Sequence, residues 1–306
     1  MKVLREDIMW IHVFSGLMSR CRTMAHAYKL CKMFGCKLTI IWPVDTECGI
    51  EFYDVFDEGI FQDIDFKVIQ IYYSKPEQIP ITSIRICPYI AYLHLRNWIS
   101  DLVVNMIKLR KVCIDLKPTE EIGWTGEKFE IFTNNSYKKI FSSLENKGNV
   151  YVHAYNGCYT HEYFDTTDYR KVLFRKEYYD IVERIVGKRK LIGLHIRRTD
   201  HEVAISSSPT KAFEKIISTL LSENENTFFF LATDDIKEQE YLLEKYPENI
   251  IVQKNKIWGR RSKESMESGI IDFLCLTKCS CIYGSYTSVF SHMAAEIGDF
   301  ELHIVK

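Results

Sequence analysis

The sequence predicts an α/β protein made of two doubly wound domains, each with a parallel sheet. Short apolar runs of strand length alternate with segments of helical periodicity near both ends of the chain. The length of 306 residues exceeds what one hydrophobic core usually organises, which favours two domains. Three of the later strands end in polar residues, as strands that border a ligand site do. We expect the domains to comprise residues 1–180 and 181–306.

The first elements predict a strand-helix-strand unit. Residues 8–14 are apolar and strand-like, and residues 19–34 have apolar side chains at helical spacing. Gly35 follows as the C-cap of this helix, because glycine readily adopts the left-handed conformation that ends helices. Residues 38–42 form the next apolar run, and Pro43 is expected to close it.

The middle of the chain is less regular. Residues 57–71 indicate loops and short strands, and residues 94–111 predict a helix. A further helix between loops is expected within 123–149, followed by a strand at 151–155. The apolar residues at helical spacing in the first of these helices are Leu95, Trp98, Leu102, Met106 and Leu109.

The last third alternates clearly between strands and helices, which predicts the second doubly wound unit. The expected strands are 190–196, 227–232, 250–253 and 281–284. The expected helices are 175–186, 212–221, 236–246, 265–278 and 288–297.

Composition excludes several classes. The net charge of −1 gives no support for binding nucleic acid. No apolar run is long enough to span a membrane, and the start of the sequence lacks the features of a signal peptide, so we expect a cytoplasmic protein, with attachment to the inner face of the membrane as an alternative. The ten cysteines are then expected to be reduced. Cys275, Cys279 and Cys281 lack metal-ligand spacing and are expected to pack in the core.

Polar residues follow three strands of the second unit. They are His195–Asp200, Thr233–Asp235 and Gly284–Ser288. Because the carboxyl ends of parallel strands meet at one edge of a sheet, these residues should line a cleft between the two domains.

Arg197 and Arg198 directly follow an apolar strand, where two guanidinium groups favour an anion such as a phosphate. The alternative is a structural ion pair with Asp200 or Asp234. Ser288 precedes a helix whose N-terminus, with Ser285 and Thr287 beside it, could bind the same anion. The alternative there is an N-cap without a ligand.

Asp272 lies inside an apolar stretch, where a carboxylate needs a partner. Either a salt bridge or the N–H donors of a guanine edge would satisfy it. Asp234 and Asp235 are adjacent, so their side chains should point in opposite directions and not share a metal. We expect structural roles for both, with one contacting sugar hydroxyls.

Gly16 opens the first helix, and Arg20 follows one turn later. Arg20 should face the cleft and could reach a phosphate or the substrate, and the alternative is a solvated arginine. No G-x-G-x-x-G follows the first strand, which argues against an oxidoreductase that binds a dinucleotide.

The segments Leu194–Asp200, Leu231–Asp235 and Gly269–Glu296 resemble, in order and rough spacing, three motifs of the α-1,6-fucosyltransferases. This family includes the nodulation fucosyltransferases, with protein O-fucosyltransferases as more distant relatives. Residues 16–20, 41–43 and 47–48 resemble the start of bacterial members. The resemblance covers about 110 residues well.

The resemblance implies a GT-B fold, two Rossmann-like domains facing a cleft, and transfer of fucose from GDP-fucose to a glycan hydroxyl. It implies inversion at the anomeric carbon without a metal or other cofactor. Arg197 would hold the β-phosphate, Ser288 would contact phosphate, and Asp272 would read guanine with His195 nearby. The donor-binding set would be His195, Arg197, Arg198, Asp234, Asp235, Asp272, Ser285, Thr287 and Ser288.

The sequence departs from this family after the RRTD segment. A glutamate that serves as the candidate base of the family lies at another offset here, which leaves Glu202 and Asp200 as candidate bases. Two alternatives therefore stay open. One is a glycosyltransferase with another nucleotide sugar, and the other is a non-catalytic protein that binds a GDP-sugar. The expected acceptor is an oligosaccharide or glycoconjugate.

Overall fold

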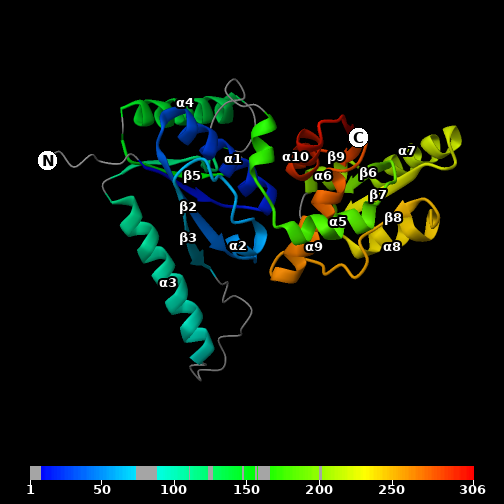
Figure 1. Ribbon diagram of the computed structural model, residues 1–306, viewed down its shortest axis with the longest axis horizontal. Helices are drawn as coiled ribbons and strands as arrows, with labels where there is room; N and C mark the ends of the chain where they lie inside the picture. The colour runs from blue at the N-terminus through cyan, green and yellow to red at the C-terminus, as the bar shows by residue number, and fades with distance from the viewer. Residues whose placement is uncertain are drawn as a thin grey trace. The chain divides into compact units, whose positions relative to one another are not determined.

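The protein is represented by a computed structural model, which describes residues 8–73, 88–109, 111–122, 127–146, 148–155, 157, 166–199 and 202–306 (Figure 1). Of residues 88–91 and 166–168 it describes the backbone alone. The chain divides into two compact units, Met1–Leu173 and Phe174–Lys306. The sequence placed the boundary after residue 180.

The first unit contains a parallel five-stranded sheet in the order β3-β2-β1-β5-β4. Helices connect the strands, as parallel neighbours require. The strands are β1 (Ile8–Val13), β2 (Lys37–Val44), β3 (Phe66–Tyr72), β4 (Val112–Asp115) and β5 (Val150–Ala154). The helices are α1 (Leu17–Phe34), α2 (Phe52–Val55), α3 (Pro88–Lys108), α4 (Glu127–Glu145) and the 3₁₀ helix η2 (Thr166–Lys171).

The end of α1 confirms the expected glycine cap. Gly35 has φ of 65° and its N–H donates to the carbonyl of Cys31. The expectation that Pro43 closes the next strand is wrong, because β2 continues to Val44. Pairing of β2 with β1 stops at Ile41, so Pro43 lies opposite Ile71 of β3 and has no neighbour on the β1 side of the register. A proline without an N–H is tolerated there because no ladder bond is lost.

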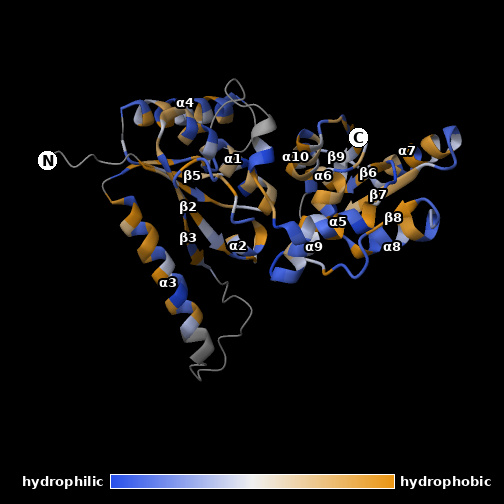
Figure 2. Cartoon of the chain, viewed as in Figure 1, coloured by the Kyte–Doolittle hydropathy of each residue, from blue (hydrophilic) through white to orange (hydrophobic). Residues whose placement is uncertain are grey.

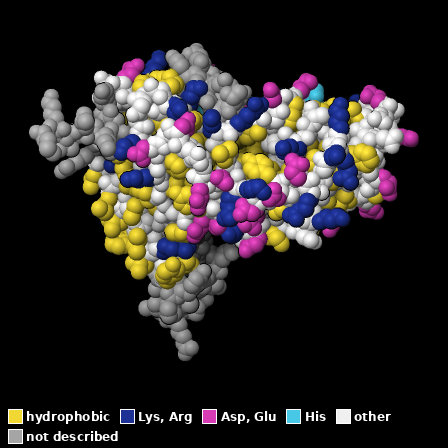
Figure 3. All heavy atoms as spheres, in the orientation of Figure 1, with side chains coloured by type: hydrophobic (Ala, Val, Ile, Leu, Met, Phe, Trp, Pro, Cys, Tyr) yellow, Lys and Arg dark blue, Asp and Glu magenta, His cyan; other side chains and the backbone are white. Residues whose placement is uncertain are grey.

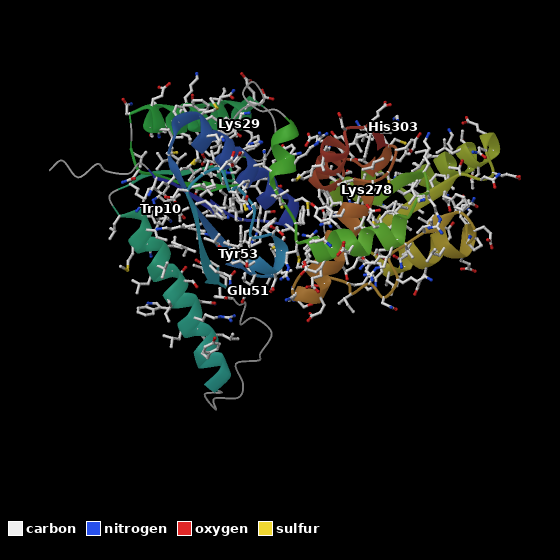
Figure 4. The ribbon with its side chains drawn as sticks, viewed as in Figure 1. Trp10, Lys29, Glu51, Tyr53, Lys278 and His303 are labelled. Atoms are coloured by element: carbon white, nitrogen blue, oxygen red, sulfur yellow. The ribbon has the colours of Figure 1, made fainter. Side chains whose placement is uncertain are left out.

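Helix α3 covers one face of this sheet, and α1 and α4 lie on the other (Figure 1). Val104 and Ile107 of α3 pack with Ile41, Ile71 and Tyr151. Trp10 also joins this cluster, beside the C-terminal end of α3 (Figure 4). The sheet therefore carries α3 as a covering layer that is fixed by an apolar contact.

The second unit repeats the architecture with a parallel five-stranded sheet in the order β10-β9-β6-β7-β8. The strands are β6 (Leu191–Ile196), β7 (Phe228–Thr233), β8 (Ile250–Ile251), β9 (Ile282–Ser285) and β10 (Leu302–Val305). The helices are α5 (Lys176–Val186), α6 (Glu202–Ser207), α7 (Thr210–Glu223), α8 (Ile236–Lys245), α9 (Lys263–Leu276) and α10 (Val289–Gly298). The expected class, two doubly wound α/β units, is confirmed.

The core of the second unit follows from the apolar strands. Leu194 and Leu231 pack with Phe213 and Ile217 of α7 and Leu242 of α8. Colouring by hydropathy shows strand β7 as mainly hydrophobic (Figure 2). No helix in the described part of the chain is long and apolar enough to cross a membrane.

Candidate functional site

The three polar strand ends of the second unit meet at one edge of its sheet. Strand β6 is central, and His195 lies opposite Gly284 of β9 and Ala232 of β7. The residues that follow these strands therefore become neighbours, as the sequence predicted.

His195 is buried at the end of β6. Its ring stacks on that of Phe290, with centroids 4.8 Å apart, and its Nδ1 has no hydrogen-bond partner. Burial, followed by the charge of Arg197, lowers the pKa of His195 to about 3. The imidazole is therefore neutral at physiological pH and offers an unused polar atom in the interior of the site.

Arg197 leaves the end of β6 between two neighbouring strands. Its backbone N–H donates to Oγ of Ser285 at 3.0 Å, and its guanidinium lies 2.7 Å from Oδ2 of Asp234. Only 17% of the Arg197 side chain is exposed. Burial raises the pKa of Asp234, but Arg197 and hydrogen bonds from residues 198 and 199 outweigh this effect and bring the pKa below its ordinary value. Asp234 is therefore a carboxylate at neutral pH.

Arg198 points to other partners than those expected. Its guanidinium lies 3.2 Å from Oε1 of Glu238 and donates to Oγ1 of Thr210. The structural ion pair with Asp234, which was one alternative for the two arginines, is formed by Arg197. The backbone N–H of Arg198 also donates to Asp234. Adjacent residues at a strand end point in opposite directions, which sends Arg198 toward α7 and α8.

The two aspartates after β7 have the structural roles that the sequence predicted. Asp234 accepts hydrogen bonds from the backbone of Arg198 and from the N–H and hydroxyl groups of Thr199. Asp235 is the N-cap of α8 and accepts from the N–H groups of Lys237 and Glu238. These contacts occupy Asp235 and fix the path of the chain after β6 and β7.

The turn between β9 and α10 contains the serine and threonine residues expected to meet an anion. Ser288 is the N-cap residue of α10, as the sequence indicated, but its side chain makes no capping hydrogen bond. Thr287 is exposed and has φ of 58°, a left-handed conformation that is costly for a β-branched residue. This turn combines backbone strain with a helix N-terminus whose N–H groups Ser288 does not cap.

Asp272, in α9, has the structural partner that was one of its two alternatives. Its Oδ2 lies 2.5 Å from Nζ of Lys256, and Lys256 also donates to the carbonyl of Thr233 at the end of β7. Burial raises the pKa of Asp272, and Lys256 opposes this effect. Lys256 Nζ lies 4.3 Å from the ring centroid of Trp258. A guanine edge could reach this carboxylate only if these covering side chains move.

Arg20 in the first unit is neither solvated nor free to meet a phosphate. Its side chain is fully buried, it forms an ion pair with Asp45 at 2.8 Å, and it donates to the carbonyls of Ser15 and Pro43. Gly16 is the N-cap residue of α1 in an extended conformation. The guanidinium joins α1 to the end of β2, so the expectation for Arg20 is corrected to a structural role.

The two candidate bases, Asp200 and Glu202, are two positions apart in sequence. Glu202 is the first residue of α6 and is exposed, whereas Asp200 lies outside the described residues. Among the described residues, no group of three or more His, Cys, Asp or Glu side chains is placed to hold a metal ion. Cys275 and Cys279 are buried, which agrees with core packing.

Sequence reasoning missed Lys256, Glu238 and Phe290, which complete the ion pairs and the stacking contact of the site. Each partner comes from a segment distant in sequence. The apolar Ile257 and Trp258 beside Lys256 were the one local sign that this lysine is partly enclosed.

No protein-family profile and no curated protein sequence matches the chain. Solved structures do. An α-1,6-fucosyltransferase, NodZ, soaked with GDP-fucose is 17% identical, with a TM-score of 0.57 over 96% of this chain and 93% of that chain. POFUT1 in complex with GDP-fucose is 8% identical, with a TM-score of 0.54 over 100% of this chain and 99% of that chain. A mutant of Arabidopsis thaliana FUT1 in complex with GDP is 14% identical, with a TM-score of 0.55 over 97% and 70%.

These similarities establish the fold. The chain has the GT-B-like fold of the fucosyltransferases, with two parallel five-stranded sheets and interleaved helices. The fold expected from the three motifs is confirmed. Because a fold supports many functions, the reaction has to be argued from the site.

Proposed function

We propose that this protein is a glycosyltransferase that moves fucose from GDP-fucose to a hydroxyl of an oligosaccharide or glycoconjugate. The observation that carries the proposal is the position of Arg197 at the end of the central strand β6, bonded through its backbone to Ser285 at the start of the turn into α10. A guanidinium and a helix N-terminus together can neutralise a diphosphate. Structures with this fold hold GDP or GDP-fucose.

The donor diphosphate would compete with Asp234 for Arg197. In the free protein the guanidinium is held by the carboxylate at 2.7 Å, which orients it in advance. Ser285, Thr287 and Ser288 would present hydroxyl and backbone N–H groups to the same anion. Arg198 and Asp235 would act indirectly, since each is occupied by protein contacts that fix the strand ends.

The guanine base of the donor would bind deeper in the second unit. In this proposal, Asp272 accepts hydrogen bonds from guanine after Lys256 and Trp258 move aside, and the neutral His195 lies nearby. Lys256 favours the ionised form of the buried carboxyl group, which is the form that accepts two donors. Asp272→Asn would replace one acceptor oxygen by a donor and should therefore reduce the selectivity for guanine.

The proposed reaction is a single displacement with inversion and without a metal ion. The acceptor hydroxyl attacks C1 of fucose, the bond from C1 to the β-phosphate oxygen breaks, and the acceptor proton passes to Glu202 or Asp200. The transition state resembles an oxocarbenium ion. Negative charge develops on the leaving phosphate, where Arg197 and the N-terminus of α10 stabilise it. We place this reaction in glycan biosynthesis in the cytoplasm.

A second candidate is a non-catalytic protein that binds a GDP-sugar. It is favoured by one observation, namely that Arg197 and Asp272 are both engaged in ion pairs within the protein. A glycosyltransferase with another nucleotide sugar keeps the same site chemistry and differs in base or sugar selectivity.

Turnover separates these candidates. GDP release from GDP-fucose would be measured with and without a panel of glycan acceptors, in the presence of a chelator and then of magnesium. We expect acceptor-stimulated release that does not need metal, and a loss of about 100–1000-fold in Arg197→Ala. Arg189→Ala, which changes an exposed arginine of the same unit, is the matched control. GDP binding without any release would support the non-catalytic candidate instead.

A further inference from the structure

Helix α3 has one face that the protein itself uses. Val104 and Ile107 pack into the apolar cluster on the sheet of the first unit. Oγ of Ser100 bonds both the N–H and the carbonyl of Tyr72, which joins the helix to the edge strand β3. These contacts fix which side of α3 faces outward.

The outward side carries an apolar stripe. It consists of residues separated alternately by three and four positions, with Trp98 beside them. The exposed fractions are Tyr92 54%, Leu95 53%, Trp98 60%, Ile99 47%, Leu102 43%, Met106 62% and Leu109 67%. Figure 3 shows hydrophobic side chains gathered over the position of α3 in Figure 1. Of the large exposed apolar side chains that the structure describes in the first unit, most thus lie on this helix or directly after it.

The spacing of the stripe is that of a coiled-coil seam. Alternating steps of three and four give a period of 3.5 residues, the period at which two helices keep the same faces together. Leu95, Leu102 and Leu109 occupy one of the two seam positions, and Ile99 and Met106 follow in the other. Isoleucine at one seam position with leucine at the other favours two strands, and Ile99 between Leu95 and Leu102 provides this combination in the middle of the stripe.

We infer that a second copy of this chain packs against α3, so that the two α3 helices form a two-helix coiled coil across a two-fold axis. A seam of apolar side chains can pack against a second copy of itself, as an isologous interface requires. The stripe spans about 26 Å of helix, given a rise of 1.5 Å per residue. Two copies of it offer roughly 1,000 Å² of apolar surface, the lower limit for a specific interface.

A membrane surface fits the stripe less well. A helix that lies on a membrane carries lysine and arginine along its polar face. In α3, the one arginine and the one lysine side chain lie near aromatic rings instead. Arg96 lies 5.0 Å from the ring of Tyr72, and Lys108 lies 5.2 Å from the ring of Tyr151. The helix therefore offers a narrow apolar seam with little basic charge beside it.

Sedimentation equilibrium of the full chain over the micromolar range tests this inference independently of any enzyme activity. We expect a dimer, and we expect Leu102→Glu to weaken association at least about tenfold because it places a charge in the seam. Ile131→Glu is the matched control, since Ile131 is 53% exposed on α4, and it should leave the dimer intact. Circular dichroism would verify that both variants are folded.

Three results would overturn the inference. A monomer at all concentrations would mean that nothing in a second copy covers the stripe. A dimer that persists unchanged in Leu102→Glu would place the interface elsewhere. A monomer that co-sediments with phosphatidylglycerol and phosphatidylethanolamine vesicles, and loses this in Leu102→Glu, would make α3 a membrane-binding face.

Discussion

Nζ of Lys256 lies 2.5 Å from Oδ2 of Asp272 in the interior of the second unit, with 9% and 4% of the two side chains exposed. Lys256 also holds the last carbonyl of β7, so the pair ties α9 to the strand end that carries Asp234. Substitutions of these two residues should therefore change both the stability of the protein and its ligand binding.

Lys256→Met should destabilise the protein by about 3–5 kcal/mol, because it leaves the carboxylate of Asp272 buried without a counter-charge. Lys256→Met combined with Asp272→Leu should recover most of this loss, since no buried charge remains. Lys176→Met is the control, because its ion pair with Asp180 is exposed and contributes at most about 1 kcal/mol. Urea unfolding measures all of them, and equal losses in the single and double variants would contradict the explanation.

His195 should make the protein sensitive to acid. Its pKa of about 3 in the folded protein lies below the ordinary 6.5, so the unfolded chain binds the proton first. The contribution of His195 to the free energy of unfolding is fully present above pH 6.5 and is lost as the pH falls toward 3. When the pH falls from 7 to 5, the free energy of unfolding should therefore decrease by about 2 kcal/mol less in His195→Phe than in the wild type.

The measurement is urea unfolding at the two pH values, followed by circular dichroism. His94→Phe, which replaces an exposed histidine on α3, is the control and should keep the pH dependence of the wild type. His12 also has a pKa lowered to about 3 by burial and then by His153, so part of the acid sensitivity should remain in His195→Phe. An unchanged pH dependence in His195→Phe would refute the role assigned to His195.

Arg20→Met should destabilise the first unit by about 3–5 kcal/mol, because Asp45 and the carbonyls of Ser15 and Pro43 lose their buried donor. Lys32→Met, whose pair with Asp63 is about half exposed, should cost at most about 1 kcal/mol. Thermal or urea unfolding decides this. Equal effects of the two substitutions would mean that Arg20 is not the structural centre that its contacts indicate.

Two glycines of the second unit should respond in opposite directions to alanine. A Cβ at Gly193 in β6 would lie 2.9 Å from side-chain atoms of Ile282 and Leu276, so Gly193→Ala should cost about 1–3 kcal/mol. A Cβ at Gly269 in α9 would meet nothing within 4 Å, so Gly269→Ala should stabilise by about 0.5–1 kcal/mol. Melting temperatures of both variants test this, and loss of stability in Gly269→Ala would contradict it.

The periodic parts of the fold could be predicted from the sequence. Most of the helices and central strands were expected because their apolar spacing is clear, and the strand ends of the site follow from parallel topology. Strands β4 (Val112–Asp115) and β10 (Leu302–Val305) were missed, because each is four residues long and depends on a neighbour for its pairing.

The partners of charged groups could not be predicted in the same way. Arg198 pairs with Glu238, 40 residues away, and Arg20 pairs with Asp45, 25 residues away. Sequence chemistry states that such groups need partners, but only the folded chain decides which ones are in reach. For Arg20, the sequence indicates the need for a partner but not that Asp45 provides it.

The most direct test of the central claim is calorimetric titration of the protein with GDP, UDP and ADP in the absence of metal. The proposed donor site predicts that GDP binds most tightly, that magnesium is not needed, and that Arg197→Ala weakens GDP binding while Arg189→Ala does not. Preference for UDP would retain a nucleotide-sugar site and reject GDP-fucose. No binding of any nucleotide would contradict the account, and the polar strand ends around Arg197 would then serve the fold alone.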